Sequence, residues 1–295
     1  MINNYRGHDN SKAFNEVVQA LRTFFLSKGF MEVHTQDRLS ILAACEDPTT
    51  VATYTYAGEI WPLPQTGQMW LEYELLTQPK LAGVFCVSTS YRAEPNPVPG
   101  RHKIIFPMFE FEAPGTVTEL EALERELCEY LGFGDAKEMK ALTYDEVAGH
   151  YGVQELGHEH ERALNEDFTK AVLLTRFPQY TSPFWNMKKD GEYAEKIDVI
   201  LGGAETIGSA ERSSDPEEMR EQFHVISDGQ YAQLLYNLFG KERVEKELEA
   251  FLSLTFFSRF GGGIGITRMI DALQKNSNTA VVSPVGAGQP LVCSK

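Results

Sequence analysis

The sequence predicts an α+β fold in which a mostly antiparallel sheet is flanked by helices. Strand-like segments cluster in the middle of the chain, at 84–91, 104–112 and 193–212, and helical patterns precede and follow them. A doubly wound α/β fold would instead alternate strands and helices along the chain. The 295 residues are 42% hydrophobic, which is enough for a sizeable core. We therefore expect a single domain over 1–295, which can carry a helical insertion over 116–170.

The individual elements follow from the spacing of apolar residues. Residues 11–28 repeat apolar side chains at helical spacing, with Ser11 as the expected N-cap and Gly29 as the stop. Residues 30–34 alternate like a strand, and the proline-rich segment 95–100 predicts a loop. We expect further helices at 68–81, 116–130, 141–151, 215–223, 228–238, 242–251 and 268–274, and further strands at 84–91, 104–112, 193–203 and 204–212.

Charge and composition exclude several classes of protein. The formal net charge of -15 argues against a generic nucleic-acid binder, because binding to a polyanion depends on clustered Lys and Arg. We expect no DNA partner, and the charge does not support tRNA, which stays open. The four cysteines lack the paired spacing of a zinc site or a disulfide framework. The N-terminus is polar, and no apolar run approaches the roughly 20 residues that span a bilayer. These features predict a cytoplasmic protein without a membrane partner.

Two separated segments carry residue types that suit a nucleotide. The first runs from Arg92 and Glu94 through a loop with Arg101 and His102 to Phe106. An arginine grips a phosphate through two hydrogen bonds, and a carboxylate two residues along a strand faces the same side, where it can fix that arginine or hold a metal. A surface ion pair is the simpler interpretation of an isolated Arg-x-Glu. The basic loop and the phenylalanine that follow favour a nucleotide site instead.

The second segment is the glycine-rich run 261–268, in which Gly265 precedes a helix that opens at Arg268. Glycine lets the backbone approach a ligand closely, and an arginine can stack on an aromatic base while it faces a phosphate. The run fits neither G-x-G-x-x-G nor G-x-x-x-x-G-K-[ST], and alone it would indicate only a structural turn. Together the two segments offer arginines for phosphates, an aromatic face for a base, and carboxylates for a cation or an amine.

This pair of segments resembles motifs 2 and 3 of class II aminoacyl-tRNA synthetases of the aspartate and asparagine branch. The resemblance implies a class II synthetase-like antiparallel sheet flanked by helices, a homodimer, and Mg²⁺-dependent formation of an aminoacyl-adenylate from ATP. It implies that Arg92 holds the α-phosphate and that Arg101 and His102 reach the γ-phosphate. Phe106 and Arg268 are expected to cover the two faces of adenine.

A third segment, 198–212, resembles the part of the same family that carries a metal-binding glutamate, a glycine turn and then an arginine. By this resemblance Glu205 binds Mg²⁺ between the ATP phosphates, with Asp198 as a second candidate, and hard oxygen ligands suit that ion. Arg212 is expected to hold the side chain of the amino acid. An acidic hairpin with exposed charges is the simpler interpretation of this segment.

The resemblance also implies a site for the amino acid. Glu46 is expected to accept its ammonium group, and Gln68 to contact it. Leu71 stands where aspartate-specific members tend to carry a lysine. Glu110 can accept a hydrogen bond from an amide NH₂ but would repel a carboxylate. Both of these cues favour asparagine over aspartate.

The sequence departs from the family in three places. The chain starts at the motif 1 helix, so we expect no anticodon-binding domain, and this weakens the case for tRNA. Gln36 stands where motif 1 usually ends in proline, and Val282-Ser283-Pro284-Val285 lacks the arginine of the usual Phe-Pro-Arg segment. The first departure also fits the ammonia-dependent asparagine synthetases, which share this catalytic core.

The sequence therefore predicts an adenylate-forming ligase that activates asparagine or aspartate with ATP and Mg²⁺. The acceptor of the acyl group stays open among tRNA, ammonia and another amine. An asparagine synthetase that uses aspartate, ATP and ammonia is the alternative within this class. In a different class, an inactive paralogue would bind an amino acid or a nucleotide as a regulator. Such a regulator is expected to lose the phosphate arginines, whereas Arg92 and Arg268 are both present.

Overall fold

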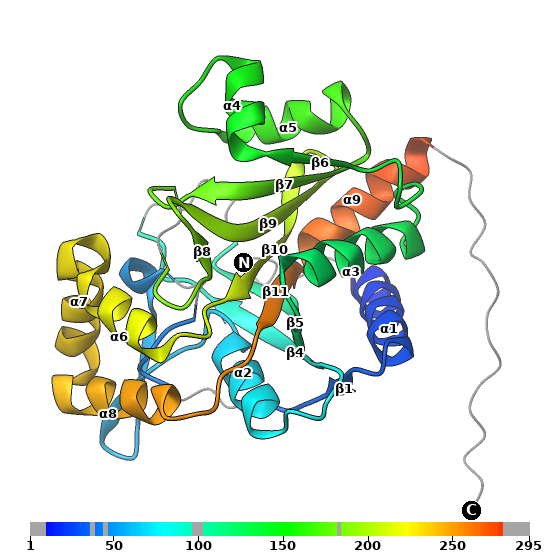
Figure 1. Cartoon of the computed structure of the whole chain (residues 1–295). Helices are drawn as coiled ribbons and strands as arrows, with labels where there is room; N and C mark the ends of the chain where they lie inside the picture. Colours follow the sequence, from blue (N-terminus) through cyan, green and yellow to red (C-terminus); the bar gives the residue numbers. More distant parts are fainter. Residues whose placement is uncertain (1–9, 36–38, 44–46, 96–102, 182–183, 280–295) are drawn as a thin grey trace, which may run out of the picture.

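A nine-stranded sheet runs through the computed structural model of the chain, which describes residues 10–35, 39–43, 47–95, 103–181 and 184–279 (Figure 1). From edge to edge its order is β1 (Met31–Glu32), β4 (Val84–Tyr91), β5 (Ile105–Pro114), β11 (Arg259–Gly265), β10 (Ala204–Arg212), β9 (Tyr193–Leu201), β7 (Ala171–Pro178) and β6 (Lys140–Thr143), while β8 (Lys189–Asp190) pairs with β9. The pairs at the two edges are parallel and those between them are antiparallel. The predicted α+β fold with a mostly antiparallel sheet is confirmed.

Three helices cover one face of this sheet, namely α1 (Ser11–Ser27), α3 (Val117–Tyr130) and α9 (Ile266–Thr279), as Figure 1 shows. Their apolar sides enter one large core with strand residues such as Phe109, Phe111 and Ile264. In α1 the buried residues recur at helical spacing, so burial of one stripe holds the helix on the sheet. The cap of this helix differs from the expectation: Asn10, not Ser11, accepts hydrogen bonds from the first backbone N–H groups.

The remaining helices lie elsewhere around the sheet. Helix α2 (Gln68–Thr77) packs on the opposite face, against β4, β5 and β11. Helices α6 (Pro216–Val225), α7 (Gln230–Phe239) and α8 (Lys241–Leu252) form a group with its own core around Trp185 and Phe251. Helices α4 (Tyr144–Tyr151) and α5 (His158–Asp167) cover the β6–β7 end, and β2 (Thr53–Tyr56) and β3 (Glu59–Pro62) form a separate hairpin. None of the helices in the described ranges is long and apolar enough to cross a lipid bilayer.

The face opposite α1, α3 and α9 is shaped by glycine. Alternate residues of a strand share a face, so Gly261 and Gly263 of β11 stand beside Glu112 and Glu110 of β5. A Cβ at Gly261 would lie 2.0 Å from Glu112 Oε1, and one at Gly263 would lie 2.7 Å from Met108 Cε. Glycine is therefore needed at these two positions so that the side chains of β5 can lie across β11.

The region 116–170 shows where the sequence-based assignment needs correction. The helix expected at 141–151 begins only at Tyr144, because residues 140–143 form β6 and pair with β7. Thr143 and Glu146 form a reciprocal capping box that fixes this start. Helix α3 packs directly on β9, β10 and β11, so this part of the region belongs to the main core of the sheet.

Candidate active site

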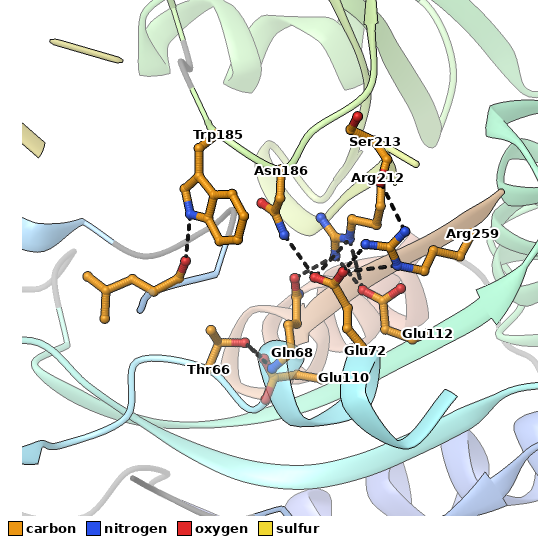
Figure 2. Close-up of polar contacts among 11 residues, drawn as sticks. Thr66, Gln68, Glu72, Glu110, Glu112, Trp185, Asn186, Arg212, Ser213 and Arg259 are labelled. Atoms are coloured by element: carbon orange, nitrogen blue, oxygen red, sulfur yellow. Dashed lines mark hydrogen bonds and ion pairs between the residues drawn. The ribbon is translucent and has the colours of Figure 1, made fainter. Parts of the chain in front are cut away.

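Four buried charges lie together on the sheet face that Gly261 and Gly263 shape, where α2 packs (Figure 2). Each is at most 2% exposed, and they are Glu72 of α2, Glu112 of β5, Arg212 of β10 and Arg259 of β11. Arg212 donates from Nε and Nη2 to Glu112 Oε1, at 2.9 and 2.7 Å, and from Nη2 to Gln68 Oε1 at 2.6 Å. Arg259 pairs with Glu72 Oε2 through Nε, at 3.0 Å, and through Nη2. We call these four residues the buried quartet.

Two further groups complete the quartet. Asn186 Nδ2 donates to Glu72 Oε1 at 2.9 Å, and Arg259 Nη1 donates to the backbone oxygen of Ser213 at 3.0 Å. A buried charge is tolerated only where it is paired and hydrogen-bonded, and here two guanidinium groups face two carboxylates. The quartet therefore has no excess charge of either sign when both carboxyls are ionised. It ties α2 to three strands of the sheet, which rigidifies the floor of the site.

Glu110 is a third buried carboxylate, two residues before Glu112 on the same strand β5. It accepts hydrogen bonds from the hydroxyls of Thr66 and Ser88 and from Gly67 N at 2.8 Å. Burial raises the pKa of Glu110 to about 7, although the hydrogen bonds from Ser88 and Gly67 act in the opposite direction. Burial likewise raises the pKa of Glu112 to about 7, against the adjacent Arg212 guanidinium. Both carboxyls therefore hold a proton at higher pH than an exposed glutamate.

The end of the sheet face carries an arginine beside an aromatic ring. Arg92 follows β4 directly, and its guanidinium carbon lies 5.5 Å from the centre of the Phe106 ring. The Arg92 Nε is buried and makes no hydrogen bond within the described part of the chain. A buried guanidinium N–H without a partner is costly unless a ligand oxygen accepts from it. This pair can thus bind a phosphate and a flat base together.

Two carboxylates face a common space on the neighbouring strands. A Cβ at Gly208 would meet Glu205 Oε1 at 2.8 Å and Asp198 Oδ1 at 3.5 Å, so the missing side chain leaves room between them. Asp198 accepts from Lys196 Nζ at 2.7 Å through Oδ2, whereas its buried Oδ1 has no hydrogen-bond partner among the described residues. Burial raises the pKa of Asp198 to about 7; Lys196 lowers it and Glu205 adds to the rise.

Arg268 joins the carboxylate pair to the glycine strand. Its Nη1 donates to the backbone oxygen of Glu205 at 2.7 Å and lies 3.9 Å from the carboxylate Oε2 of the same residue. Both side chains remain well exposed, at 49% and 40%. A Cβ at Gly265 would meet nothing closer than 3.8 Å, so the strand end beside Arg268 is open. A ligand can therefore approach the backbone here.

The predicted site residues fall into three sets. One set lies toward one end of the same sheet face and consists of Arg92, Phe106, Gly265, Arg268, Asp198 and Glu205. A second set lies further along this face and consists of Gln68, Glu110 and Arg212. Glu94 is half-buried just past Arg92. The third set lies outside the described residues and consists of Glu46, Arg101 and His102. The departures at Gln36 and at Val282-Ser283-Pro284-Val285 also lie outside them. The roles assigned to all these residues remain predictions.

Four residues of the site were not anticipated from the sequence. They are fully buried although each is polar or charged, namely Glu72, Glu112, Asn186 and Arg259. The available signal was a charge inside an apolar pattern: Glu72 follows Leu71 on a largely buried helix, and Arg259 opens the glycine strand. Such charges are seldom fully buried unless they are paired, so they point to a buried partner without naming it.

Comparison with known proteins gives a consistent picture. Residues 2–284 match the family model described as tRNA synthetases class II (D, K and N). The cytoplasmic asparagine–tRNA ligase of Mus musculus is 27% identical over 259 residues, which cover 74% of this chain and 45% of the mouse protein. The aspartate–tRNA(Asp/Asn) ligase of Methanopyrus kandleri is 26% identical over 234 residues, which cover 68% of this chain and 52% of that protein. The chain thus spans about half the length of the curated relatives it matches.

Solved structures agree on the fold. The asparaginyl-tRNA synthetase of Pyrococcus horikoshii, complexed with asparaginyl-adenylate, superposes with a TM-score of 0.73 at 22% identity, over 90% of this chain and 64% of that chain. At this identity the likeness bears on the fold alone. The sequence match over almost the whole chain decides the family, and the sheet, its flanking helices and the glycine strand accord with it. The chain belongs to the class II tRNA synthetases of the D, K and N group.

Proposed function

We propose that this chain is an adenylate-forming ligase that activates asparagine or aspartate with ATP. The observation that carries the proposal is the arrangement on one sheet face. Arg92 has a buried N–H that finds no hydrogen-bond partner within the described ranges, and it stands beside an aromatic ring. The neighbouring strands β9 and β10 bear two carboxylates, and helix α9 bears a second arginine. This is the set of groups that a triphosphate, its base and its counter-cation require.

In the proposed reaction a carboxylate oxygen of the amino acid attacks the α-phosphorus of ATP, and pyrophosphate leaves. Arg92 binds the phosphate that reacts, and Phe106 stacks on the base. Arg268 neutralises negative charge from the opposite side of the site. No covalent bond to the protein forms, so positioning and electrostatic stabilisation of the transition state supply the rate enhancement.

Asp198 and Glu205 would hold Mg²⁺ in this reaction. The donor set fits the ion, because Mg²⁺ takes one or two protein carboxylates and leaves its other positions to phosphate oxygens and water. Asp198 Oδ1 has no donor in the part of the chain that the structure describes, which supports the assignment, since a cation satisfies a buried acceptor that lacks a donor. When bound, the ion would supply charge neutralisation to the phosphates. Within the described residues no cluster of three or more acidic, His or Cys side chains offers another metal site.

Charge around Arg212 favours asparagine over aspartate. Arg212 is already paired with Glu112 and hydrogen-bonded to Gln68, so its positive charge is largely compensated. Glu110 adds a further acidic group nearby, and no lysine stands at Leu71. A neutral amide costs less to desolvate in such surroundings than a carboxylate does, and it brings N–H donors for the acidic groups.

The acceptor and the assembly complete the proposal. We retain tRNA, ammonia and another amine as acceptors of the acyl group, and a homodimer as the assembly. The curated relatives are named as tRNA ligases, which supports tRNA. The net charge of -15 counts against it, because a polyanion binds to clustered cations.

Amino-acid-dependent ATP–pyrophosphate exchange tests the activation step. We expect exchange with asparagine to exceed exchange with aspartate, and Arg92→Ala to lower it by about 100- to 1,000-fold, as removal of a transition-state donor typically does. Arg220→Ala is the matched control, because Arg220 pairs on the surface with Glu217 of its own helix α6 and with Glu249 of α8. Exchange that persists at full rate in a folded Arg92→Ala variant would refute the assignment, and no exchange with either amino acid would favour the regulator.

A further inference from the structure

A small cavity adjoins the candidate active site and has no part in the proposed activation step. Its volume is about 110 Å³, and Phe184, Met187 and Ala194 give it an apolar side. Such a volume is smaller than the roughly 150 Å³ of an engineered cavity that holds benzene. It therefore suits a short aliphatic group rather than a nucleotide.

The cavity lies next to the predicted amino-acid site. Met187 pairs through its backbone with Arg212, and paired strands lie about 5 Å apart. Met187 and Ala194 also pack against Ala210 of β10. Along that strand Ala210 stands between Arg212 and Gly208, and Gly208 lies beneath the two carboxylates. A molecule in the cavity would thus border both halves of the site.

One charged group enters this cavity. Lys189 lines it together with Gln179 and Gln222, and the Lys189 backbone pairs with Ala194, so the two side chains share a face. Lys189 makes no hydrogen bond or ion pair among the residues that the structure describes. Burial lowers the pKa of its ammonium group, although the negative charges of Glu218 and Glu221 act in the opposite direction without pairing with it. A partly desolvated ammonium without a close partner is stabilised when an anion pairs with it.

We propose that this cavity binds the carboxylate end of a small amine, which then accepts the activated acyl group. The inference rests on the proposed function, because it supplies the second substrate of that same site. The amine nitrogen bonds to the carbonyl carbon of the aminoacyl-adenylate, the bond from that carbon to the phosphate oxygen breaks, and AMP leaves with the electron pair. The nitrogen then loses one proton to the solvent, which leaves an amide.

The chemistry of the cavity favours this acceptor over the others. Ammonia has no carboxylate and no apolar part, so it would leave both Lys189 and the apolar side unused. A tRNA needs an extended cationic surface, whereas the chain carries a net charge of -15. A short chain with an amine at one end and a carboxylate at the other uses every feature of the cavity.

The test measures AMP release with ATP, Mg²⁺, pyrophosphatase and the amino acid that supports exchange. Glycine, β-alanine and 4-aminobutyrate are the probe acceptors, and propylamine and ammonia serve as amines without a carboxylate. We expect saturable stimulation by at least one amino-acid probe and none by propylamine at equal concentration. Lys189→Met should raise the KM for that probe about 10- to 100-fold, the usual range for loss of a charge-assisted bond.

Two controls keep the inference separate from the proposed function. Pyrophosphate exchange in Lys189→Met reports on folding and on activation, and we expect it to persist because Lys189 lies outside the activation site. Lys188→Met is the matched control, since Lys188 immediately precedes β8 and does not line the cavity. Suppose that wild-type exchange is normal but AMP release responds only to ammonia, only to tRNA, or equally to propylamine. This result would overturn the acceptor inference and leave the proposed activation step standing. A wild-type protein that shows no exchange would overturn both the acceptor inference and the proposed function.

Discussion

Removal of Arg259 should destabilise the protein more than most single substitutions. Its three N–H groups bind both Glu72 and the Ser213 carbonyl, and the side chain is fully buried. In Arg259→Met, Glu72 keeps Asn186 at 2.9 Å, but its nearest remaining cation is Arg212 at 3.9 Å. The negative charge is then buried and poorly compensated.

The magnitude follows from the cost of leaving a buried charge unpaired. Breaking a buried ion pair at one partner costs about 3–5 kcal/mol, whereas a typical domain is stable by about 5–15 kcal/mol. Replacing both partners removes the unpaired charge, so Glu72→Leu combined with Arg259→Met should lose less than the two single variants together. We expect a coupling free energy of about 3 kcal/mol, the upper end for contacting residues.

Urea unfolding of the wild type, the two single variants and the double variant measures this cycle. Circular dichroism and tryptophan fluorescence should be followed together, because coincident transitions justify the two-state free energies. Trp185 lies next to Asn186 and serves as a local probe. A loss below about 1 kcal/mol in Arg259→Met, or strictly additive single variants, would show that the quartet does not act as a unit.

Further substitutions test the glycine positions and the buried acid. Gly261→Ala places a Cβ 2.0 Å from Glu112 Oε1, so we expect a loss of at least about 2 kcal/mol in urea unfolding, as for other overpacked cores. Gly208→Ala brings a methyl group within 2.8 Å of Glu205 Oε1, in the space between the two carboxylates. The Mg²⁺ concentration for half-maximal pyrophosphate exchange should therefore rise several-fold, and an unchanged concentration would speak against this metal site. Because the pKa of Glu110 is raised to about 7 in the fold, its contribution to stability is complete below the unfolded value of 4.5 and is lost as the pH rises towards 7. The urea midpoint should therefore fall between pH 5 and pH 8, and Glu110→Gln should flatten that slope; an identical slope in this variant would contradict the assignment.

Local patterns were sufficient to predict much of the sheet. The strand expected at 84–91 is observed with those bounds, and those expected at 193–203 and 204–212 are observed as β9 and β10 around Gly202 and Gly203. Apolar runs that end at turn residues account for this success. Strand β7 was not assigned, because a continuous run such as Ala-Val-Leu-Leu lacks the alternation that separates a strand from a buried helix.

Sequence reasoning could group candidate site residues only where two consecutive strands bring them together. Arg92 with Phe106, and Asp198 with Glu205, lie close to each other along the chain, so spacing and resemblance identify them. The quartet joins α2, β5, β10 and β11, and its pairs are 100 and 187 residues apart along the chain. No local pattern encodes such pairs, which arise from the order of strands in the sheet.

The central claim is that this sheet face makes an aminoacyl-adenylate. The most direct measurement is a single-turnover reaction with radiolabelled ATP, Mg²⁺, pyrophosphatase and asparagine, quenched in acid and separated to reveal the labelled product. We predict asparaginyl-AMP in an amount close to that of the active sites, and its absence in Arg92→Ala and in reactions without an amino acid. A wild-type protein that binds ATP and asparagine but forms no adenylate would contradict the claim.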